Sequence, residues 1–102
     1  MKKKTYTKKH IIADLALRHE LSMNTSQTIV DDFFDIIRGY LMENRHSTRI
    51  EIRSFGVLEV KPTKAKPKAR NPKTNEVLFV PAHKKTRFKP GKILKDHLKK
   101  PI

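Results

Sequence analysis

The sequence contains no cysteine, and its 102 residues include only three glycines. Without cysteine the chain forms neither disulfides nor thiolate metal sites, and its redox compartment is left open. The glycines do not have the spacing of a P-loop or of a dinucleotide-binding loop. No apolar run approaches the roughly 18–20 residues that a bilayer-spanning helix needs. We therefore expect neither a membrane segment nor a nucleotide-binding loop.

The residue patterns typical of enzymes are also missing. The five histidines show neither HxH nor HExxH spacing, which argues against a zinc site, and no serine lies in a nucleophile elbow. His83 lies among lysines and is interpreted as a polar residue rather than a base. Asp31, Asp32 and Asp35 are interpreted as an acidic helix surface rather than a metal site. We predict no catalytic residue, no metal, no cofactor and no small-molecule substrate.

What the sequence does contain is positive charge, and that charge is unevenly placed. Lysine and arginine number 24 against 10 acidic residues, for a net charge of +14. Residues 1–46 hold eight basic and six acidic side chains, whereas residues 47–102 hold sixteen and four. A nearly balanced half joined to a strongly cationic half indicates a scaffold that carries a polyanion-binding surface. The basic N-terminus has no apolar region after it, so we expect a cytoplasmic protein without a secretory signal.

Two helices are predicted at the start of a single domain over residues 7–102. Residues 1–6 are interpreted as a solvated basic tail, with a supplementary phosphate contact as the alternative. Thr7 is the expected N-cap of a helix over residues 8–20, and Ser22 that of the next helix. The second helix has an apolar stripe too wide for one chain to cover, so we expect an isologous dimer. Its expected interface residues are Phe33, Ile37, Tyr40 and Leu41.

Strands follow the helices. Ile50 and Ile52 alternate with charged residues, as in a strand with one buried face, and residues 54–56 reverse the chain into a second strand, residues 57–60. Residues 77–80 are predicted to return as the third strand. Pro90 is predicted in the first turn of a final helix, from Gly91 to about residue 99. The fold class is therefore α+β, with the order α-α-β-β-β-α.

The segment from residue 61 to 87 contains almost nothing that could form a core. Between Lys61 and Glu76 it has six basic side chains against one acidic side chain, and its prolines disfavour a helix. Residues 71–75 have the composition of a turn, in which Asn75 can adopt a left-handed conformation. We predict two extended basic limbs folded back on each other, an arm over residues 61–86. The alternative is a solvated linker.

The side chains of this arm favour a nucleic-acid partner. Lys64, Lys66, Lys68 and Arg70 alternate, so we expect them on one face of the extended limb. Arg70 and Asn71 suit a DNA minor groove, and Pro72 can wedge between base pairs and kink the duplex. As an alternative, Pro72 is an ordinary turn proline. The returning limb and the last helix add further basic residues: Lys84, Lys85, Arg87, Lys89, Lys92, Lys95 and Lys99.

Three motifs resemble the bacterial HU/IHF family of nucleoid proteins. The residues RNPKTNE, 70–76, are similar to that family's RNPxTGE arm tip, SFGVL, 54–58, to its GFGxF hairpin, and FKPGK, 88–92, to its F-x-P-G-K motif. The resemblance covers residues 7–99. It implies two N-terminal helices, a three-stranded antiparallel sheet with a long β-arm, a short C-terminal helix and an intertwined homodimer. It also implies arms that hold double-stranded DNA in the minor groove, each kinking the duplex with a prolyl tip.

The resemblance also implies roles for individual residues. Phe55 and Phe88 are expected at the dimer interface. The expected DNA contacts lie at the arm tip, on the ascending limb, at the hairpin and on the first and last helices: Arg70, Asn71, Pro72, Lys73, Lys61, Lys64, Lys66, Lys68, Arg53, Ser54, Lys8, Lys92 and Lys95. The chain departs from the family pattern where Asn75 and Ser54 replace glycines and where Lys84, Lys85 and Arg87 add charge. The ascending limb is also about one residue longer than usual.

We therefore predict a nucleoid-associated architectural protein that binds, bends and compacts DNA largely independently of sequence. Site-specific DNA bending is one alternative, and RNA or ribosome binding is another, although the shallow minor groove of an RNA duplex suits a narrow arm poorly. A nuclease is disfavoured because metal-ligand spacing is missing. Pairing with a paralogue in place of a second copy also stays open.

Overall fold

The computed structural model describes residues 2–102, except for the side chain of Ala69. The chain forms two compact units, which divide after Gly39. No helix among the described residues is both long enough and apolar enough to cross a bilayer.

The first unit holds helix α1 (Lys8–His19) and all but the last two residues of helix α2 (Met23–Leu41). Thr7 is the N-cap of α1, and its N–H donates to His10 Nδ1 over 3.0 Å. The helix ends at Glu20, which adopts a left-handed conformation with φ of 53°. Ser22 Oγ then accepts a hydrogen bond from Thr25 N–H at 3.1 Å and caps α2. Both predicted caps are confirmed.

The apolar stripe of α2 is only partly covered in the single chain. Val30 is buried, but Phe33 is 53 % exposed and Tyr40 is 49 % exposed. In α1, Ile12 and Ala16 are buried. A chain of this size normally buries more apolar area than this, so much of the stripe is available to a partner.

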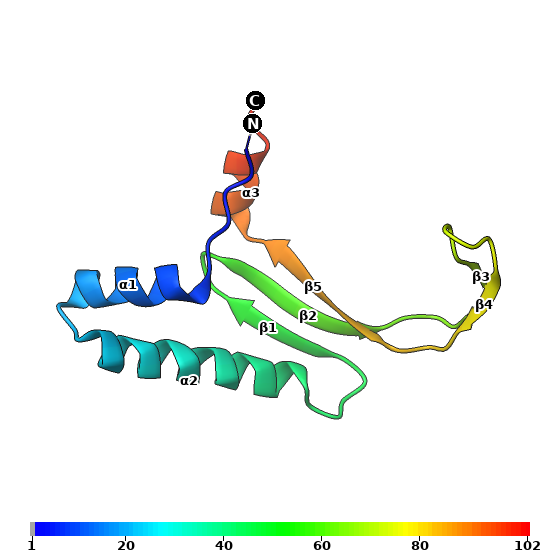
Figure 1. Cartoon of the computed structure of the whole chain (residues 1–102), viewed down its shortest axis with the longest axis horizontal. Coiled ribbons are helices and arrows are strands. Elements are labelled where there is room, and N and C mark those ends of the chain that lie inside the picture. Colours follow the sequence, from blue (N-terminus) through cyan, green and yellow to red (C-terminus); the bar gives the residue numbers. More distant parts are fainter. Residues whose placement is uncertain (1) are drawn as a thin grey trace. The chain divides into compact units, whose positions relative to one another are not determined.

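The second unit is built on a three-stranded antiparallel sheet of order β1-β2-β5 (Figure 1). Its strands are β1 (Thr48–Ile52), β2 (Gly56–Pro62) and β5 (Lys84–Pro90). The predicted hairpin at residues 54–56 is confirmed. The prediction of Val77–Val80 as the third strand was wrong, because that segment is β4 and pairs only with β3 (Lys66–Arg70). The third strand is β5, which carries Phe88.

The prediction for Pro90 was also wrong. Pro90 is the last residue of β5, and the final helix α3 spans Lys92–Leu98 with Gly91 as its N-cap. Strand β5 is the last strand in the order β1-β2-β5 and is therefore an edge strand of the sheet, where proline is tolerated. The Gly91 N–H donates to the Phe55 carbonyl over 2.8 Å, which joins the end of β5 to the β1–β2 hairpin.

Two of the three sequence motifs thus meet in the structure. The rings of Phe55 and Phe88 have centroids 5.4 Å apart. A Cβ on Gly56 would collide with the Phe88 ring, and a Cβ on Gly91 would press against the Phe55 backbone. Close approach therefore requires glycine at position 56 and favours it at position 91, and the hairpin and the start of α3 form one packed corner.

The register gives the sheet two chemically different faces. Leu58 pairs with Ile50 and Phe88, so that one face is apolar. Glu59 pairs with Arg49 and Arg87, and we call its side the charged face. By alternation the charged face carries five basic residues, two acidic residues and one valine: Arg49, Lys61, Lys85, Arg87, Lys89, Glu51, Glu59 and Val57.

Candidate nucleic-acid interface

The tip of the arm is a hydrogen-bonded turn. Asn71 N–H donates to the Glu76 carbonyl over 2.8 Å, and Asn75 N–H donates to the Asn71 carbonyl over 2.7 Å. The Asn71 side-chain oxygen accepts a hydrogen bond from Lys73 N–H at 2.9 Å. Asn75 has a φ of 60°, so the left-handed conformation predicted for it is confirmed. The turn thus presents an exposed Pro72 between two polar strand ends.

The side chain of Arg70 forms a hydrogen bond to a residue of this turn. Its guanidinium donates to the Asn75 side-chain oxygen over 3.3 Å. Asparagine at this position therefore does two things that glycine could not do together: it adopts the left-handed conformation and it accepts from Arg70. A cationic side chain is thus held by a hydrogen bond to the turn that carries the exposed proline.

Behind the tip, β3 and β4 form a two-stranded ribbon with a shift in register. We call residues 66–80 the distal ribbon. Lys66 pairs with Val80, whereas Ala69 pairs with Leu78 and Arg70 with Val77. Three steps along β3 therefore match two along β4, so β3 contains one extra residue, as in a β-bulge. Such an irregularity accommodates an ascending limb that is about one residue longer than is usual in the family that the sequence resembles.

This extra residue corrects the prediction that Lys64, Lys66, Lys68 and Arg70 share one face. Lys66 lies on the face of its partner Val80, and Arg70 lies on that of Val77. Since Val77 and Val80 are an odd number of residues apart, these two faces are opposite. Lys64 lies outside both strands. The basic side chains of the ascending limb are therefore divided between the two sides of the ribbon.

The distal ribbon and the three-stranded sheet are joined by three residues on each strand (Figure 1). The β2–β5 ladder ends with Pro62 and Lys84, and Thr63 and His83 come next. Thr63 Oγ1 donates to the His83 carbonyl over 3.1 Å and accepts from His83 N–H at 3.3 Å. The predicted polar role of His83 thus takes the form of a cross-strand hydrogen bond at the base of the distal ribbon.

The charged face of the sheet brings together several predicted DNA contacts. Lys61 and Lys85 are directly opposite each other, and Arg87 is opposite Glu59. Lys84 pairs with Pro62 and so belongs to the other face. Lys84, Lys85 and Arg87 are part of β5 in the sheet, rather than of the ribbon strand that returns from the tip. The predicted returning limb therefore divides into β4 near the tip and β5 in the sheet.

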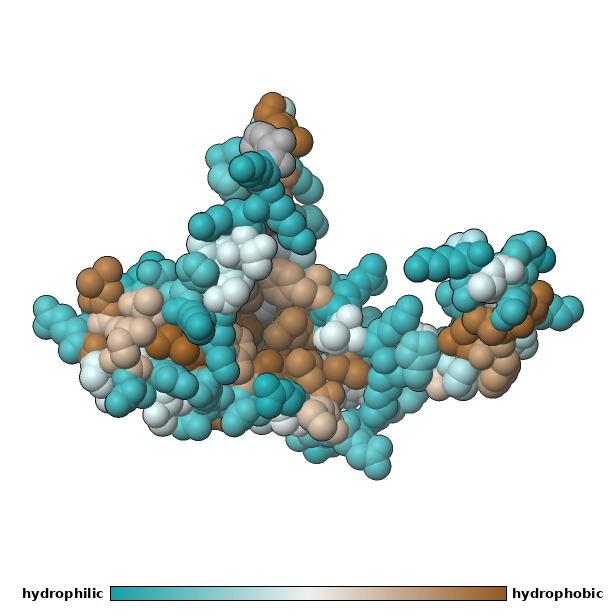
Figure 2. Space-filling model, in the orientation of Figure 1, coloured by the Kyte–Doolittle hydropathy of each residue, from teal (hydrophilic) through white to brown (hydrophobic). Residues whose placement is uncertain are grey.

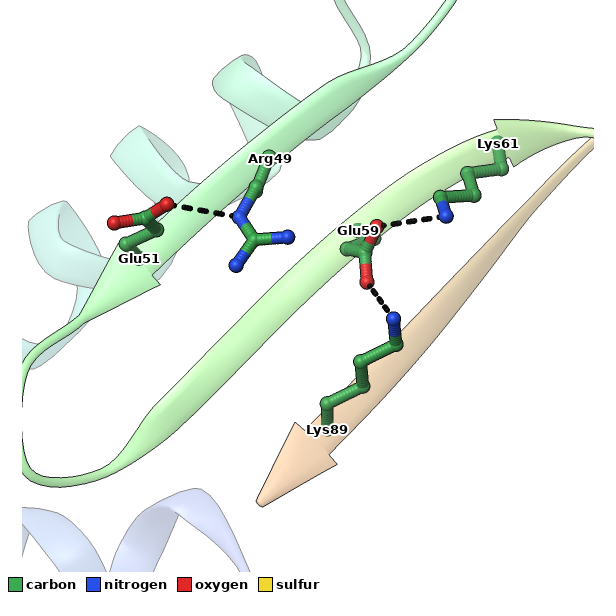
Figure 3. Close-up of polar contacts among 5 residues, drawn as sticks. All are labelled: Arg49, Glu51, Glu59, Lys61 and Lys89. Carbon is green, nitrogen blue, oxygen red and sulfur yellow. Dashed lines mark hydrogen bonds and ion pairs between the residues drawn. The ribbon is translucent and has the colours of Figure 1, made fainter. Parts of the chain in front are cut away.

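Glu59 organises two of the cations on this face (Figure 3). Its carboxylate lies 2.8 Å from Lys89 Nζ and 3.2 Å from Lys61 Nζ, and its side chain is only 5 % exposed. The hydrogen bond from Lys89 lowers the pKa of this carboxyl below its ordinary value of 4.5, in spite of burial, and Lys61 adds to the effect. Near neutral pH the group is thus a fixed negative charge that holds both ammonium groups close.

The remaining predicted contacts lie elsewhere. Arg53, Ser54 and Lys92 line one shallow depression where the β1–β2 hairpin meets the start of α3. Ser54 has a φ of 66°, in the left-handed region, where the family motif has glycine. Lys95 lies in the last turn of α3. Lys8 belongs to the helical unit, where its Nζ lies 2.7 Å from Asp31 Oδ1. Among residues 2–102, no cluster of histidine, aspartate and glutamate has the arrangement of a metal site.

Sequence reasoning gave no functional role to three charged residues of the charged face, Arg49, Glu51 and Glu59. The Arg49 guanidinium forms an ion pair with the Glu51 carboxylate over 2.9 Å within β1 (Figure 3). Glu59 forms ion pairs with both Lys61 and Lys89. The signal was present, since Glu59 and Lys61 alternate with the apolar Leu58 and Val60. Alternation assigns a face to each residue but does not show which residues of neighbouring strands meet, and this depends on register.

Comparisons with known proteins agree with this geometry. The family model described as Bacterial DNA-binding protein matches residues 6–99. The chain belongs to this family, which comprises the HU and IHF proteins. The chain has three helices and antiparallel strands, so the predicted α+β fold is confirmed.

Individual HU proteins show how far this similarity extends. The chain is 35 % identical over 99 residues to the probable DNA-binding protein HU of Chlamydia trachomatis, covering 95 % of this chain and 94 % of that protein. It is 39 % identical over 89 residues to DNA-binding protein HU 1 of Bacillus subtilis, covering 87 % and 92 %. The Anabaena HU–DNA cocrystal structure matches with a TM-score of 0.78 at 22 % identity, covering 94 % of this chain and all of that one.

Proposed function

We propose that this protein is a nucleoid-associated architectural protein that binds double-stranded DNA through the minor groove, bends it and compacts it, largely independently of sequence. The observation that carries the proposal is the arm tip. There Arg70, Asn71 and Pro72 lie at the end of a narrow two-stranded ribbon, with Arg70 hydrogen-bonded to the turn. Arginine and amide side chains suit the minor groove, and proline is one of the residues that wedge between base steps.

Most of the affinity in this proposal comes from phosphate neutralisation. The distal ribbon supplies Lys66, Lys68 and Lys73, and the charged face supplies Lys61, Lys85 and Arg87. The contacts of Lys64, Lys84, Arg53, Ser54, Lys8, Lys92 and Lys95 remain part of the proposal. Cations that neutralise phosphates release counterions, so binding weakens steeply with salt and depends little on sequence.

The proposed role of Pro72 is to kink the duplex. Its ring has no donor, and the turn leaves it exposed at the apex of the arm. Unstacking one base step costs on the order of a few kcal/mol, which is offset when the bent duplex contacts more of the basic surface.

We further propose that the protein acts as an intertwined homodimer. The apolar side chains of α2 support this, since Phe33 and Tyr40 remain about half exposed in one chain, and Phe55 and Phe88 are 52 % and 41 % exposed. Ile37 and Leu41 extend the same surface of α2. A second copy would cover this area and supply a second arm, as an isologous interface does. A paralogue with the same apolar surface would cover this area as well as a second copy does.

In this proposal residues 7–102 form one DNA-binding domain, residues 61–86 are the arm that embraces DNA, and residues 1–6 are a basic tail. The test is a gel-shift series with linear, nicked and pre-bent duplexes at two salt concentrations, together with energy transfer between dyes at the duplex ends. We expect binding that random-sequence DNA competes away, end-to-end shortening at saturation, and dimers in sedimentation. A monomer at micromolar concentration, or a saturated duplex with unchanged curvature, would contradict the proposal.

A further inference from the structure

The distal ribbon has an apolar strip that phosphate binding does not explain. Val77 is 59 % exposed and Phe79 is 66 % exposed, although both belong to a ribbon with four basic side chains and one acidic side chain. Because they are two residues apart in β4, their side chains leave the strand on the same side. Figure 2 shows hydrophobic side chains on the surface of the distal ribbon, directly beside hydrophilic ones. An exposed phenylalanine on a projecting ribbon is a candidate contact residue.

This strip lies on the face of the ribbon that carries Arg70. Arg70 pairs directly with Val77, so their side chains share one side, and Phe79 follows roughly 7 Å further along β4. Leu78 and Val80 are on the opposite face, with Lys66. If Arg70 enters a groove, Val77 and Phe79 enter it as well.

We propose that Val77 and Phe79 lie against the deoxyribose walls of the duplex and make the arm select DNA over RNA. The inference rests on the proposed function, because it places the Arg70 face of the ribbon in the minor groove. It adds to Pro72, whose proposed contact is with a base step rather than with sugars.

The chemistry of the two sugars supplies the selectivity. In the minor groove of B-form DNA the deoxyribose walls present the C–H groups of C1′ and C4′, which an apolar strip can cover without burying an unpaired hydroxyl. The minor groove of an RNA duplex displays the ribose 2′-hydroxyls, each of which is both a donor and an acceptor. Burying such a hydroxyl against a phenyl ring without a hydrogen-bond partner is unfavourable. Val77 and Phe79 have no polar side-chain atom with which to satisfy it.

The charge around the strip favours DNA over a second protein surface. Between Lys61 and Glu76 the chain has six basic side chains and one acidic side chain. A second arm packed against Phe79 would bring an equal positive charge close, whereas a polyanion neutralises it. The strip is also interleaved with basic residues rather than isolated from them, since Arg70 is directly opposite Val77.

The test compares variants on the two faces of β4. The strip variant is Val77→Thr with Phe79→Thr, which keeps β-branched residues in the strand, and the matched control is Leu78→Thr on the opposite face, where Leu78 is 43 % exposed. A third variant, Phe79→Leu, keeps an apolar side chain. Each is titrated by fluorescence anisotropy against a DNA duplex and an RNA duplex of the same sequence at one salt concentration, and sedimentation reports self-association.

We expect the strip variant to bind DNA about tenfold more weakly and RNA within about twofold of the original chain. The control and Phe79→Leu should remain within about twofold on both duplexes. Unchanged DNA affinity of the strip variant, or equal losses of affinity for DNA and RNA, would overturn this inference but not the proposed function. So would loss of a self-associated species without a change in DNA affinity. If the original chain fails to bind DNA, the proposed function and this inference both fail.

Discussion

The charged face of the sheet and the distal ribbon are both cationic, but their cations are held differently. On the charged face, Lys61 and Lys89 share the buried carboxylate of Glu59. The distal ribbon has four basic side chains and one acidic residue, Glu76, close to the tip. The sheet therefore presents ammonium groups at positions set by an internal anion. The ribbon presents cations whose positions are set mainly by its backbone.

This difference suggests a division of labour. An internal anion lowers the local net charge and so reduces the gain that each lysine makes on meeting a phosphate. Its benefit is that the two lysine side chains are already held in place, so that less conformational entropy is lost when they bind phosphate. The ribbon keeps its full charge and can adapt to a curved duplex. We thus expect the ribbon to dominate affinity and the sheet to contribute less per residue.

The strongest test neutralises three cations in each region. One variant carries Lys66→Gln, Lys68→Gln and Lys73→Gln in the distal ribbon, and the matched variant carries Lys61→Gln, Lys85→Gln and Arg87→Gln on the charged face. We expect the first to lose more affinity and to reduce the slope of log K against log salt by up to about 2.7, or about 0.9 per phosphate. The second should reduce the slope by less, because Lys61 already has a partner in Glu59. Equal slopes for the two variants would show that the ribbon and the charged face contribute equally to phosphate binding.

A second test separates two functions at the arm tip. Pro72→Ala removes the ring but no charge, so bending should fall more than affinity. Arg70→Ala removes a cation hydrogen-bonded to Asn75, and it should weaken binding itself by roughly tenfold. Energy transfer across a labelled duplex measures bending, and anisotropy measures affinity on the same samples. If both variants lose bending and affinity in the same proportion, Pro72 is not a wedge.

The third test concerns Glu59 and acid. Its pKa is lowered in the folded protein, chiefly by Lys89, so its ion pairs add stability above the ordinary value of 4.5. That stability is lost as the pH falls below 4.5 and the carboxylate takes up a proton. The melting temperature of the original chain should therefore drop more between pH 6 and pH 3 than that of Glu59→Gln.

Glu51→Gln is the matched control. Glu51, like Glu59, forms an ion pair, in its case with Arg49, but the Glu51 side chain is 70 % exposed. An exposed pair contributes little, so this variant should follow the original chain closely over the same pH range. If Glu59→Gln and Glu51→Gln behave alike, burial between the two lysines has no special effect.

Local patterns in the sequence were sufficient to predict much of this molecule. Thr7 and Ser22 identified the helix starts, alternation around Ile50 identified β1, and Asn71 to Asn75 identified the tip. Each of these signals depends on residues within a few positions of one another, so tertiary structure has little opportunity to override it. The motifs around Phe55 and Phe88 then predicted the family.

What could not be predicted depends on pairing between distant residues. Val77–Val80 has the composition of a sheet strand, and only its pairing with β3 shows that it belongs to the ribbon. The extra residue on β3 reverses the face of Lys66 relative to Arg70, and sequence alternation alone cannot reveal this. The pairing of Glu59 with Lys89 likewise depends on the β2–β5 register.

The smallest expected effect is a change in stability at two non-glycine residues with left-handed backbone conformations, Ser54 in the β1–β2 hairpin and Asn75 at the arm tip. Ser54 has a φ of 66° and Asn75 a φ of 60°. Serine tolerates this conformation less well than asparagine, so Ser54→Gly should stabilise the fold by about 0.5 kcal/mol, the relief of strain exceeding the entropy that glycine adds to the unfolded chain. Asn75→Gly should give no gain, because it also removes the acceptor of the Arg70 hydrogen bond. Urea titrations of both variants measure the difference, and an equal gain for the two would show that asparagine is strained as much as serine is.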